Sequence, residues 1–252
     1  MRFANALELL LVHCQGEIGK VIVGGAPEIP GSSIVEKMSH INEVDDGLRR
    51  FVTFEPRAHA AQSVNLLLPP TRPDADAAFI VLQADRAHPM SGSNCICVVT
   101  ALLESGRVPM VEPETSVRLD TAAGLVTVRA RCADGRCLSV SLDNVPAFAL
   151  ALDKPVRTAG WGTIRADIAF GGVFYALVDV EQVGLAIVPE NARVLAEAGM
   201  AIKADLEGQV EVGHPDIPDL DQIAYVMFRD QDPDGTVRTC TTLKPGRVDR
   251  SP

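Results

Sequence analysis

The stretch PMSGSNCICVVTALLESG, from Pro89 to Gly106, joins a Ser-Gly-Ser turn directly to an apolar run at helical spacing. Ser91 and Ser93 carry hydroxyls that donate or accept hydrogen bonds, and Gly92 lets a ligand approach the backbone closely. The apolar run predicts a helix that is buried on most sides. The first turn of a helix has unpaired N–H groups and the positive end of the dipole, so it suits an anion. A ligand site and an internal helix cap are both open, and spacing alone favours the cap.

The composition indicates a chain that can bury a substantial, mostly aliphatic core. It has 252 residues, of which 47% are hydrophobic and 4% aromatic, and its formal net charge is −10. This charge and the lack of basic runs argue against nucleic acid and anionic membranes as partners. No apolar run is long enough to span a membrane, and the N-terminus lacks the pattern of a signal peptide. The six cysteines lack a metal-ligand spacing, so we expect free thiols in a cytoplasmic protein.

Most segments of the chain are predicted to be strands. The alternating stretch 126–142 has Asp134-Gly135 at its centre, which is a strong hairpin signal. Cys132 and Cys137 flank this turn, and two half-buried strand residues are favoured over a cross-strand disulfide. Further strands are predicted at 7–14, 20–25, 63–68, 77–82, 116–119, 162–169, 174–180, 222–228 and 236–242.

Helices are few and separated along the chain, which indicates an α+β fold. They are predicted at 34–51 after a cap at Ser32 or Ser33, from Ser91 onward, and at 190–200. Prolines and a glycine punctuate the region between 144 and 162. We therefore place a domain boundary near residue 150, with one domain at 1–150 and the other at 151–252.

Other functional signals are weak. The five histidines are scattered, and the glycines of 169–176 indicate either a strand bulge or close approach to a ligand. The sequence has no nucleophile elbow, phosphate loop, dinucleotide fingerprint or HExxH motif. A serine hydrolase built on Ser91 and His88 lacks a third partner.

Blocks spread over almost the whole chain resemble the proline racemase family in their order and spacing. The first catalytic block of that family is similar to PMSGSN (89–94), and the start of its second block is similar to VDRSP (248–252). The other similar blocks are HCQGEIGKVIVGG (13–25), IPGSSIVEKM (29–38), EPRAH (55–59), RLDTAAGLV (118–126) and DIAFGGVFYALVD (167–179).

This resemblance implies a diaminopimelate epimerase-like fold of two pseudo-symmetric halves, each a strand-rich layer around a central helix. It places a catalytic residue at the N-terminus of each central helix, in a cleft between the halves, and implies no cofactor and no metal. Ser91 takes the first catalytic position, and Gly92 and Ser93 would bind the carboxylate of an imino acid substrate. Asp249 would bind the ring nitrogen. The ligand site thus becomes the favoured interpretation of the helix start. Family members are often dimers, which leaves a homodimer open as the assembly.

Two departures from the family pattern bear on activity. Ser91 stands where racemases have a cysteine, and a hydroxyl is a much poorer base than a thiolate. Cys95 and Cys97 lie inside the predicted helix and are expected to be core residues. The family also continues Cys-Gly-Thr-Gly after VDRSP and then forms the second central helix. We therefore expect an incomplete second half, a truncated product and little turnover from the chain as given.

Three functions stay open on this basis. The favoured one is dehydration of trans-3-hydroxy-L-proline to Δ1-pyrroline-2-carboxylate, because family members with one hydroxyl residue in the catalytic pair resemble that enzyme. An unequal pair suits loss of water, with one strong base at Cα and Ser91 assisting the leaving hydroxyl. Val173, where epimerases commonly have asparagine, points the same way. The alternatives are a hydroxyproline 2-epimerase or proline racemase, and an inactive relic that at most binds an amino acid.

Overall fold

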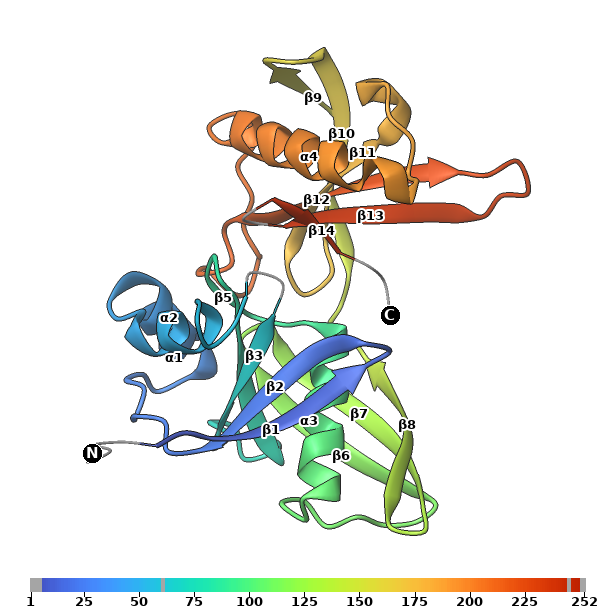
Figure 1. The fold of residues 1–252 in the computed structure, drawn as a ribbon. Coiled ribbons are helices and arrows are strands. Elements are labelled where there is room, and N and C mark those ends of the chain that lie inside the picture. Colours follow the sequence, from blue (N-terminus) through green and yellow to red (C-terminus); the bar gives the residue numbers. More distant parts are fainter. Residues whose placement is uncertain (1–5, 60–61, 244–245, 250–252) are drawn as a thin grey trace. The chain divides into compact units, whose positions relative to one another are not determined.

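The computed structural model describes residues 6–59, 62–243 and 246–249. Within them the chain forms two compact units, the first ending at Val145 and the second beginning at Pro146 (Figure 1). Strands far outnumber helices in both units, so the predicted α+β class is confirmed.

The first unit is built on an eight-stranded mixed sheet. Its strand order is β1-β2-β3-β4-β6-β7-β8, and the short strand β5 pairs with β4 off this path. Neighbouring strands are antiparallel except for the parallel pairs β2–β3 and β4–β6. The strands are β1 (Glu8–Cys14), β2 (Glu17–Gly24), β3 (Ser63–Leu68), β4 (Ala77–Leu82), β5 (Ala87–His88), β6 (Glu114–Thr121), β7 (Gly124–Ala133) and β8 (Arg136–Asp143).

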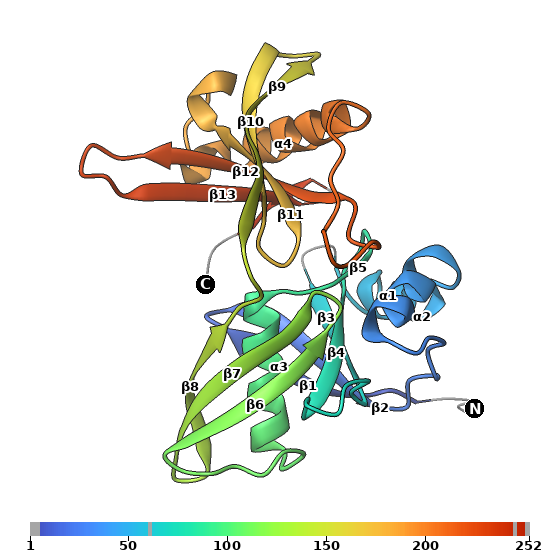
Figure 2. The same ribbon diagram turned by 180° about the vertical axis from the view of Figure 1, so that it is seen from behind.

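The predicted buried helix is α3 (Gly92–Glu104), and Ser91 is its N-cap residue. Strands β1, β2, β3, β7 and β8 all contact it, and Figure 2 shows β6, β7 and β8 along one side of the helix. The helix approaches β2 closely, because a Cβ atom added to Gly19 would lie 2.7 Å from the Sγ atom of Cys97. Eight of its residues are buried: Asn94, Cys95, Cys97, Val98, Val99, Ala101, Leu102 and Leu103.

The single helix predicted at 34–51 is wrong, because the structure has two helices there. They are α1 (Ile34–Glu43) and α2 (Gly47–Thr53). The side chain of Asp45 accepts a hydrogen bond from the Gly47 N–H at 2.8 Å, which offers the backbone a turn in place of a helix. The predicted cap holds, since the Ser33 hydroxyl accepts from the Glu36 N–H at 3.1 Å.

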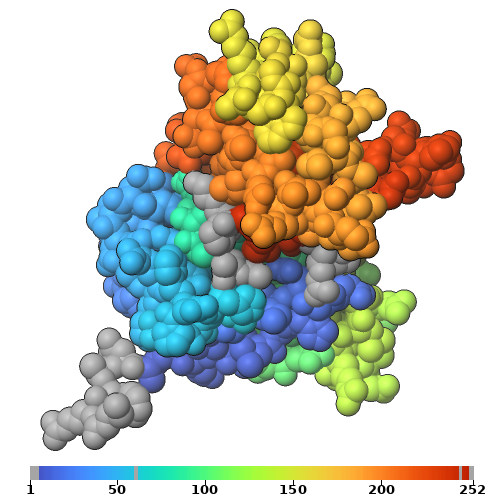
Figure 3. Space-filling model, turned by 45° about the horizontal axis from the view of Figure 1, so that its top comes forward, coloured from blue at the N-terminus to red at the C-terminus, as the bar shows by residue number. Residues whose placement is uncertain are grey.

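The second unit is built on a six-stranded sheet in the order β14-β13-β12-β11-β10-β9. Its strands are β9 (Phe148–Thr158), β10 (Gly162–Phe170), β11 (Phe174–Asp179), β12 (Ile223–Gln231), β13 (Val237–Leu243) and β14 (Arg247–Val248). The helix predicted at 190–200 is α4 (Ala192–Leu206), which follows the 3-10 turns η1 (Val180–Val183) and η2 (Pro189–Asn191). It packs on strands β9, β12, β13 and β14. The far end of the hairpin β12–β13 projects beyond the rest of this unit (Figure 3).

Strand β9 is not predicted from the sequence, because Pro155 and its neighbours indicate a domain boundary there. The structure places β9 at the edge of the sheet, where it pairs with β10 alone and Pro155 lies opposite Arg165. An edge strand tolerates proline, because the missing N–H group has no second strand to bond. Residues 148–158 are therefore part of the second unit's sheet.

The predicted hairpin is confirmed as β7–β8. Asp134 and Gly135 both have positive φ angles, of 53° and 69°, as a tight hairpin turn requires. Cys132 and Cys137 face each other in the register, and both are free thiols.

The two units repeat one connection pattern. In each, an antiparallel pair (β1–β2 or β10–β11) is followed by a helical crossover to a parallel strand (β3 or β12). An antiparallel strand (β4 or β13) and a two-residue strand (β5 or β14) come next. In the first unit β5 leads into Ser91 and α3, whereas β14 leads into Asp249 in the second. The second unit has no counterpart of α3 among residues 146–243 and 246–249.

Candidate functional site

Ser91 is the N-cap residue of α3 by position, but its side chain does not cap the helix. Its backbone is extended, with φ −155° and ψ 129°, and its side chain makes no capping hydrogen bond to the helix. The first helical bond runs from the Cys95 N–H to the Ser91 carbonyl at 2.9 Å. By contrast, the Ser33 hydroxyl caps α1 in the usual way. The first turn of α3 therefore offers N–H groups and a positive dipole end without a serine side chain across them, which suits an anion.

Helices α1 and α2 hold the segment that leads into Ser91. Asn42 on α1 bonds both ways with the backbone of Ala87, donating to its carbonyl at 3.1 Å and accepting from its N–H at 2.8 Å. The buried Arg49 on α2 donates to the carbonyls of Gln83 at 3.1 Å and Ala84 at 2.7 Å. These contacts fix the chain on both sides of the turn between β4 and β5.

The hydroxyl of Ser91 has two polar partners among the described residues. The Asn94 side chain donates to it from Nδ2 at 2.9 Å, and the Ser93 hydroxyl lies 3.4 Å away. Asn94 in turn accepts at Oδ1 from Nδ2 of Asn65, at 2.8 Å. Neither an amide nor a neutral hydroxyl is a strong base, so these partners do not turn Ser91 into a strong nucleophile.

Sequence reasoning missed Asn65 and Asn94. Asn65 lies on β3 and is 0% exposed, and Asn94 is 2% exposed. A signal was present, since Asn65 interrupts the apolar run of the strand SVNLLL. A fully buried amide within an apolar strand needs a partner, and this partner is on the helix that begins at Ser91.

His88 belongs to the framework of this region. It is 2% exposed on β5, and its Nε2 atom lies 3.1 Å from Oδ1 of Asp85. This contact links β5 back to the turn that precedes it.

Cys95 and Cys97 are core residues, as predicted. Burial raises the pKa of both thiols to about 12, and the charges of Cys14 and Glu17 add to the effect at Cys97. At neutral pH both groups stay protonated, and a protonated thiol is a poor base and nucleophile.

We expect Cys95 and Cys97 to resist iodoacetamide in the native protein near neutral pH. With a pKa of about 12, the thiolate fraction is negligible, and burial also blocks the reagent. Peptide mass spectrometry after a timed reaction checks this, with Cys137 as the partly exposed comparison. Modification of Cys97 as fast as Cys137 would contradict the buried position of α3.

Asp249 follows β14 in the second unit. Its N–H donates to the Thr241 carbonyl at 2.8 Å, and its carboxylate lies 3.8 Å from Nη1 of Arg247, with 38% of the side chain exposed. Burial raises the pKa of Tyr175 to about 12, and the charge of Asp249 adds to this shift. Tyr175 is therefore a neutral phenol, and it lies close enough to the Asp249 carboxylate for that charge to affect its pKa.

An apolar cluster lies beside Tyr175. Val173, Tyr225 and Leu243 form it, with Tyr175 and Ala224 packed against it. The rings of Tyr175 and Tyr225 are 5.7 Å apart. Val173 is 6% exposed, so the residue that replaces the family's asparagine serves the packing here. A carboxylate next to apolar surface suits a ligand with a charged nitrogen and hydrocarbon parts.

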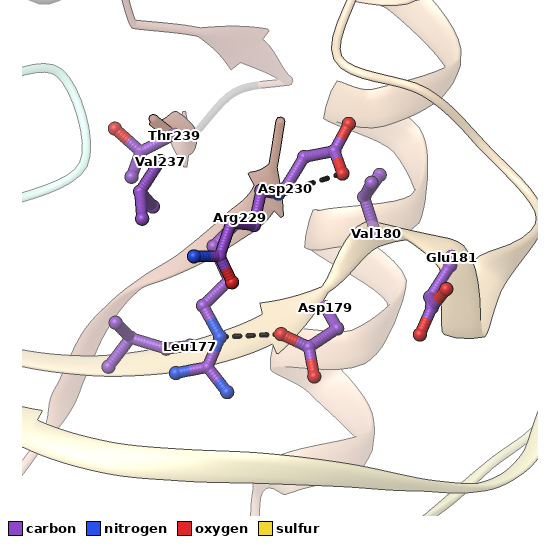
Figure 4. Close-up of a pocket in the computed structure, with 9 residues that line it drawn as sticks. Leu177, Asp179, Val180, Glu181, Arg229, Asp230, Val237 and Thr239 are labelled. Carbon is purple, nitrogen blue, oxygen red and sulfur yellow. Dashed lines mark hydrogen bonds and ion pairs between the residues drawn. The ribbon is translucent and has the colours of Figure 1, made fainter. Parts of the chain in front are cut away.

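A hollow of about 670 Å³ lies between η1 and the strands β11, β12 and β13 (Figure 4). Arg229 crosses it, and its guanidinium bonds Asp179 at 2.5 Å and Asp167 at 2.7 Å. A backbone N–H from Asp153 and the Arg229 charge hold the pKa of Asp167 below its usual value. Because this cation is already paired with two carboxylates, the hollow is a weaker candidate for an anionic ligand than the start of α3.

No group of three or more His, Cys, Asp and Glu side chains among the described residues is placed to hold a metal ion. No helix in this part of the chain has the length and hydropathy to cross a membrane.

Comparison with known proteins adds a family match and close relatives. The family described as proline racemase matches residues 9–252. The chain is 58% identical to a 4-hydroxyproline 2-epimerase of Allorhizobium ampelinum, covering 100% of this chain and 73% of the relative. It is 55% identical to a 4-hydroxyproline 2-epimerase of Agrobacterium fabrum, covering 100% and 74%.

Two solved structures are also similar. A hydroxyproline epimerase from Agrobacterium vitis, with bound trans-4-hydroxy-L-proline, has a TM-score of 0.95 at 58% identity, covering 100% of this chain and 74% of that chain. A probable proline racemase from Agrobacterium radiobacter K84, with bound carbonate, has a TM-score of 0.94 at 56% identity, covering 98% and 73%.

Proposed function

The chain belongs to the proline racemase family, and from this we propose that it serves as a hydroxyproline 2-epimerase. One observation carries the proposal: the relative that is 58% identical over the whole chain is a 4-hydroxyproline 2-epimerase. The similar structure with bound trans-4-hydroxy-L-proline supports the same substrate class. Inversion at Cα alone would convert that compound into cis-4-hydroxy-D-proline.

The residues of the first unit fit one half of this reaction. Epimerisation removes a proton from Cα and returns one to the opposite face, so it needs an acid–base group on each face. We assign Ser91 to one face, and the resemblance assigns the other to the block that follows Asp249. Gly92 and Ser93 would bind the carboxylate through the first-turn N–H groups and a hydroxyl.

Asp249 would bind the ring nitrogen of the substrate. A secondary amine of this kind is protonated at neutral pH, so a carboxylate is its natural partner. The apolar cluster around Tyr225 offers hydrocarbon surface for the ring carbons. A homodimer and a cytoplasmic location stay predictions.

Dehydration of trans-3-hydroxy-L-proline, which the sequence favoured, becomes the second candidate. Its support is Ser91, whose hydroxyl suits the role of an acid that assists a leaving group. Val173 no longer adds to it, because its place in an apolar cluster explains that residue. The relatives support epimerisation more than dehydration.

The test is to incubate the protein in D2O with trans-4-hydroxy-L-proline and, separately, trans-3-hydroxy-L-proline, and to follow both by NMR. Deuterium at Cα with the hydroxyl retained, and appearance of the cis D-isomer, is the expected result for the first compound. Loss of the hydroxyl from the second, with no exchange in the first, would establish the dehydratase instead. Proline in a third sample detects a racemase.

Gly92→Ala is expected to raise the KM for trans-4-hydroxy-L-proline by about tenfold without loss of stability. A Cβ atom at Gly92 meets nothing within 4 Å, so the fold has room for it. The new methyl group would instead occupy space that the carboxylate needs, and loss of one charge-assisted hydrogen bond corresponds to about that factor. Steady-state kinetics and a thermal melt measure the two effects. An unchanged KM would remove Gly92 from the carboxylate site.

A further inference from the structure

The side chain of Ser91 is held by a chain of hydrogen bonds through two buried amide side chains. Asn94 donates to its hydroxyl at 2.9 Å, and Asn65 donates to Asn94 at 2.8 Å. Asn65 comes from β3 and Asn94 from the first turn of α3, so the chain of bonds ties the helix start to the sheet.

This arrangement is costly, which argues that it does more than fill space. The Oδ1 atom of Asn65 is buried and has no hydrogen-bond partner in the described residues. A buried acceptor left unpaired is unfavourable, and an apolar residue of similar size would avoid the cost. The amide group of Asn65 instead uses its donor side to orient Asn94.

The direction of these hydrogen bonds decides whether the Ser91 hydroxyl accepts from Asn94 or donates to it. Because Nδ2 of Asn94 is the donor, the serine oxygen accepts, and its own proton is left to point elsewhere. An N–H group aimed at this oxygen also stabilises negative charge on it after the proton leaves. Serine is thereby biased towards giving a proton, and the poor basicity of a hydroxyl matters less.

We propose that Asn94 and Asn65 are positioning residues that make Ser91 the proton donor at the substrate's Cα. This rests on the proposed function. In the step, the Ser91 O–H bond breaks as the electron pair at Cα takes the proton and forms the new C–H bond. The charge left on the serine oxygen is stabilised by the Asn94 N–H. In the reverse direction the same N–H stabilises the alkoxide that accepts the proton from Cα.

The decisive experiment needs no substrate. Ser91→Cys introduces a thiol at the same position, and the pH dependence of its alkylation by iodoacetamide gives its pKa. The helix start and the Asn94 donor should both lower that pKa. Adding Asn94→Ala should raise it by about one unit, which slows alkylation near neutral pH by about tenfold. Peptide mapping separates this thiol from the native cysteines, of which Cys95 and Cys97 stay protonated.

Further variants test the same proposal if Asn94→Ala fails to fold. Asn94→Asp keeps the size but places a carboxylate beside the thiol, so it should raise the pKa further. Asn65→Leu removes the group that orients Asn94 and should shift the pKa in the same direction. Thr100→Ala, on the same helix and bonded to the Ile96 carbonyl at 2.8 Å, is the matched control and should leave it unchanged.

Two outcomes overturn the proposal. If Asn94→Ala leaves the pKa of the introduced thiol unchanged, Asn94 does not act on that position. If the pKa falls, Asn94 presents its oxygen to Ser91, and serine is poised as a base. If no hydroxyproline shows exchange at Cα, the proposed function fails. The titration of the introduced thiol still decides whether Asn94 and Asn65 act on the group at position 91. With Ser91 in place, Asn94→Ala is expected to lower kcat about tenfold and leave KM unchanged.

Discussion

Replacing Ser91 with alanine is expected to slow the inversion of trans-4-hydroxy-L-proline to cis-4-hydroxy-D-proline by about a thousandfold. General acid–base groups contribute on this scale, and the alanine variant has no proton to give on that face. Stability should change little, because the Ser91 side chain does not cap α3. The loss is limited to its hydrogen bond with Asn94, worth about 1 kcal/mol, and the longer contact with Ser93. Formation of the cis D-isomer, followed by NMR, checks the effect on the reaction, and a thermal melt of each variant checks the effect on stability.

Ser93→Ala is the matched control, since its hydroxyl lies 3.4 Å from that of Ser91 on the same turn. We expect it to affect KM more than kcat, because its assigned partner is the carboxylate. Equal losses of kcat in the two variants would show that Ser91 has no special place in the proton transfer.

The largest expected effect on stability is that of Gly199→Ala in α4. An added Cβ atom would clash with Oγ1 of the buried Thr242 on β13 and would lie 2.6 Å from its Cβ atom, so the helix must move away from the sheet. Overpacking of this kind costs about 3 kcal/mol, and alanine returns about 1 kcal/mol of helix propensity. The net loss should be about 2 kcal/mol, measured as the shift of the denaturant midpoint for the second unit.

A double variant separates the clash from other causes. Thr242→Ala alone removes a hydrogen bond to the Val226 carbonyl, which is 3.0 Å long. It also makes room for the new methyl group, so the Gly199→Ala/Thr242→Ala protein should lose less stability than the sum of the single variants. Gly92→Ala, which has open space around its Cβ position, is the control for a glycine change at a helix. Simple additivity would mean that the contact with Thr242 is not the cause.

The elements with strong local signals could be predicted from the sequence. The apolar run after Ser91 could form little but a buried helix, and Asp134-Gly135 supplied the positive φ angles of a hairpin turn. In both cases residues close in the sequence determine the local structure. The serine at the helix start could be located in the same way, but whether it caps α3 could not, because that depends on Asn94 competing for its hydroxyl.

The elements that depend on distant partners could not be predicted. Pro155 belongs to a strand because β9 is an edge, and an edge is a property of the whole sheet. The break between α1 and α2 depends on the turn at Asp45, which the apolar spacing hides. The buried amide of Asn65 has a hydrogen-bond partner because α3 brings Asn94 to it from 29 positions further along the chain.

The choice of reaction was limited by a different difficulty. Two residues, Ser91 and Val173, pointed to dehydration, whereas relatives matching the whole chain favour epimerisation. Acid–base groups of one type serve both reactions, because each begins with loss of the proton at Cα. The identity of the catalytic residue alone therefore cannot distinguish them.

The division of the chain at Val145 and Pro146 has a consequence for biosynthesis. All strands of the first sheet precede this point, and all strands of the second follow it. Neither sheet has to wait for a strand from the other, so the first can close on the ribosome while the second is still being translated. At about 5 to 20 residues per second, the 107 residues from 146 to 252 take about 5 to 20 seconds to emerge. That interval is long enough for a domain of this size to fold before its neighbour appears, which limits mispairing between two sheets of similar design.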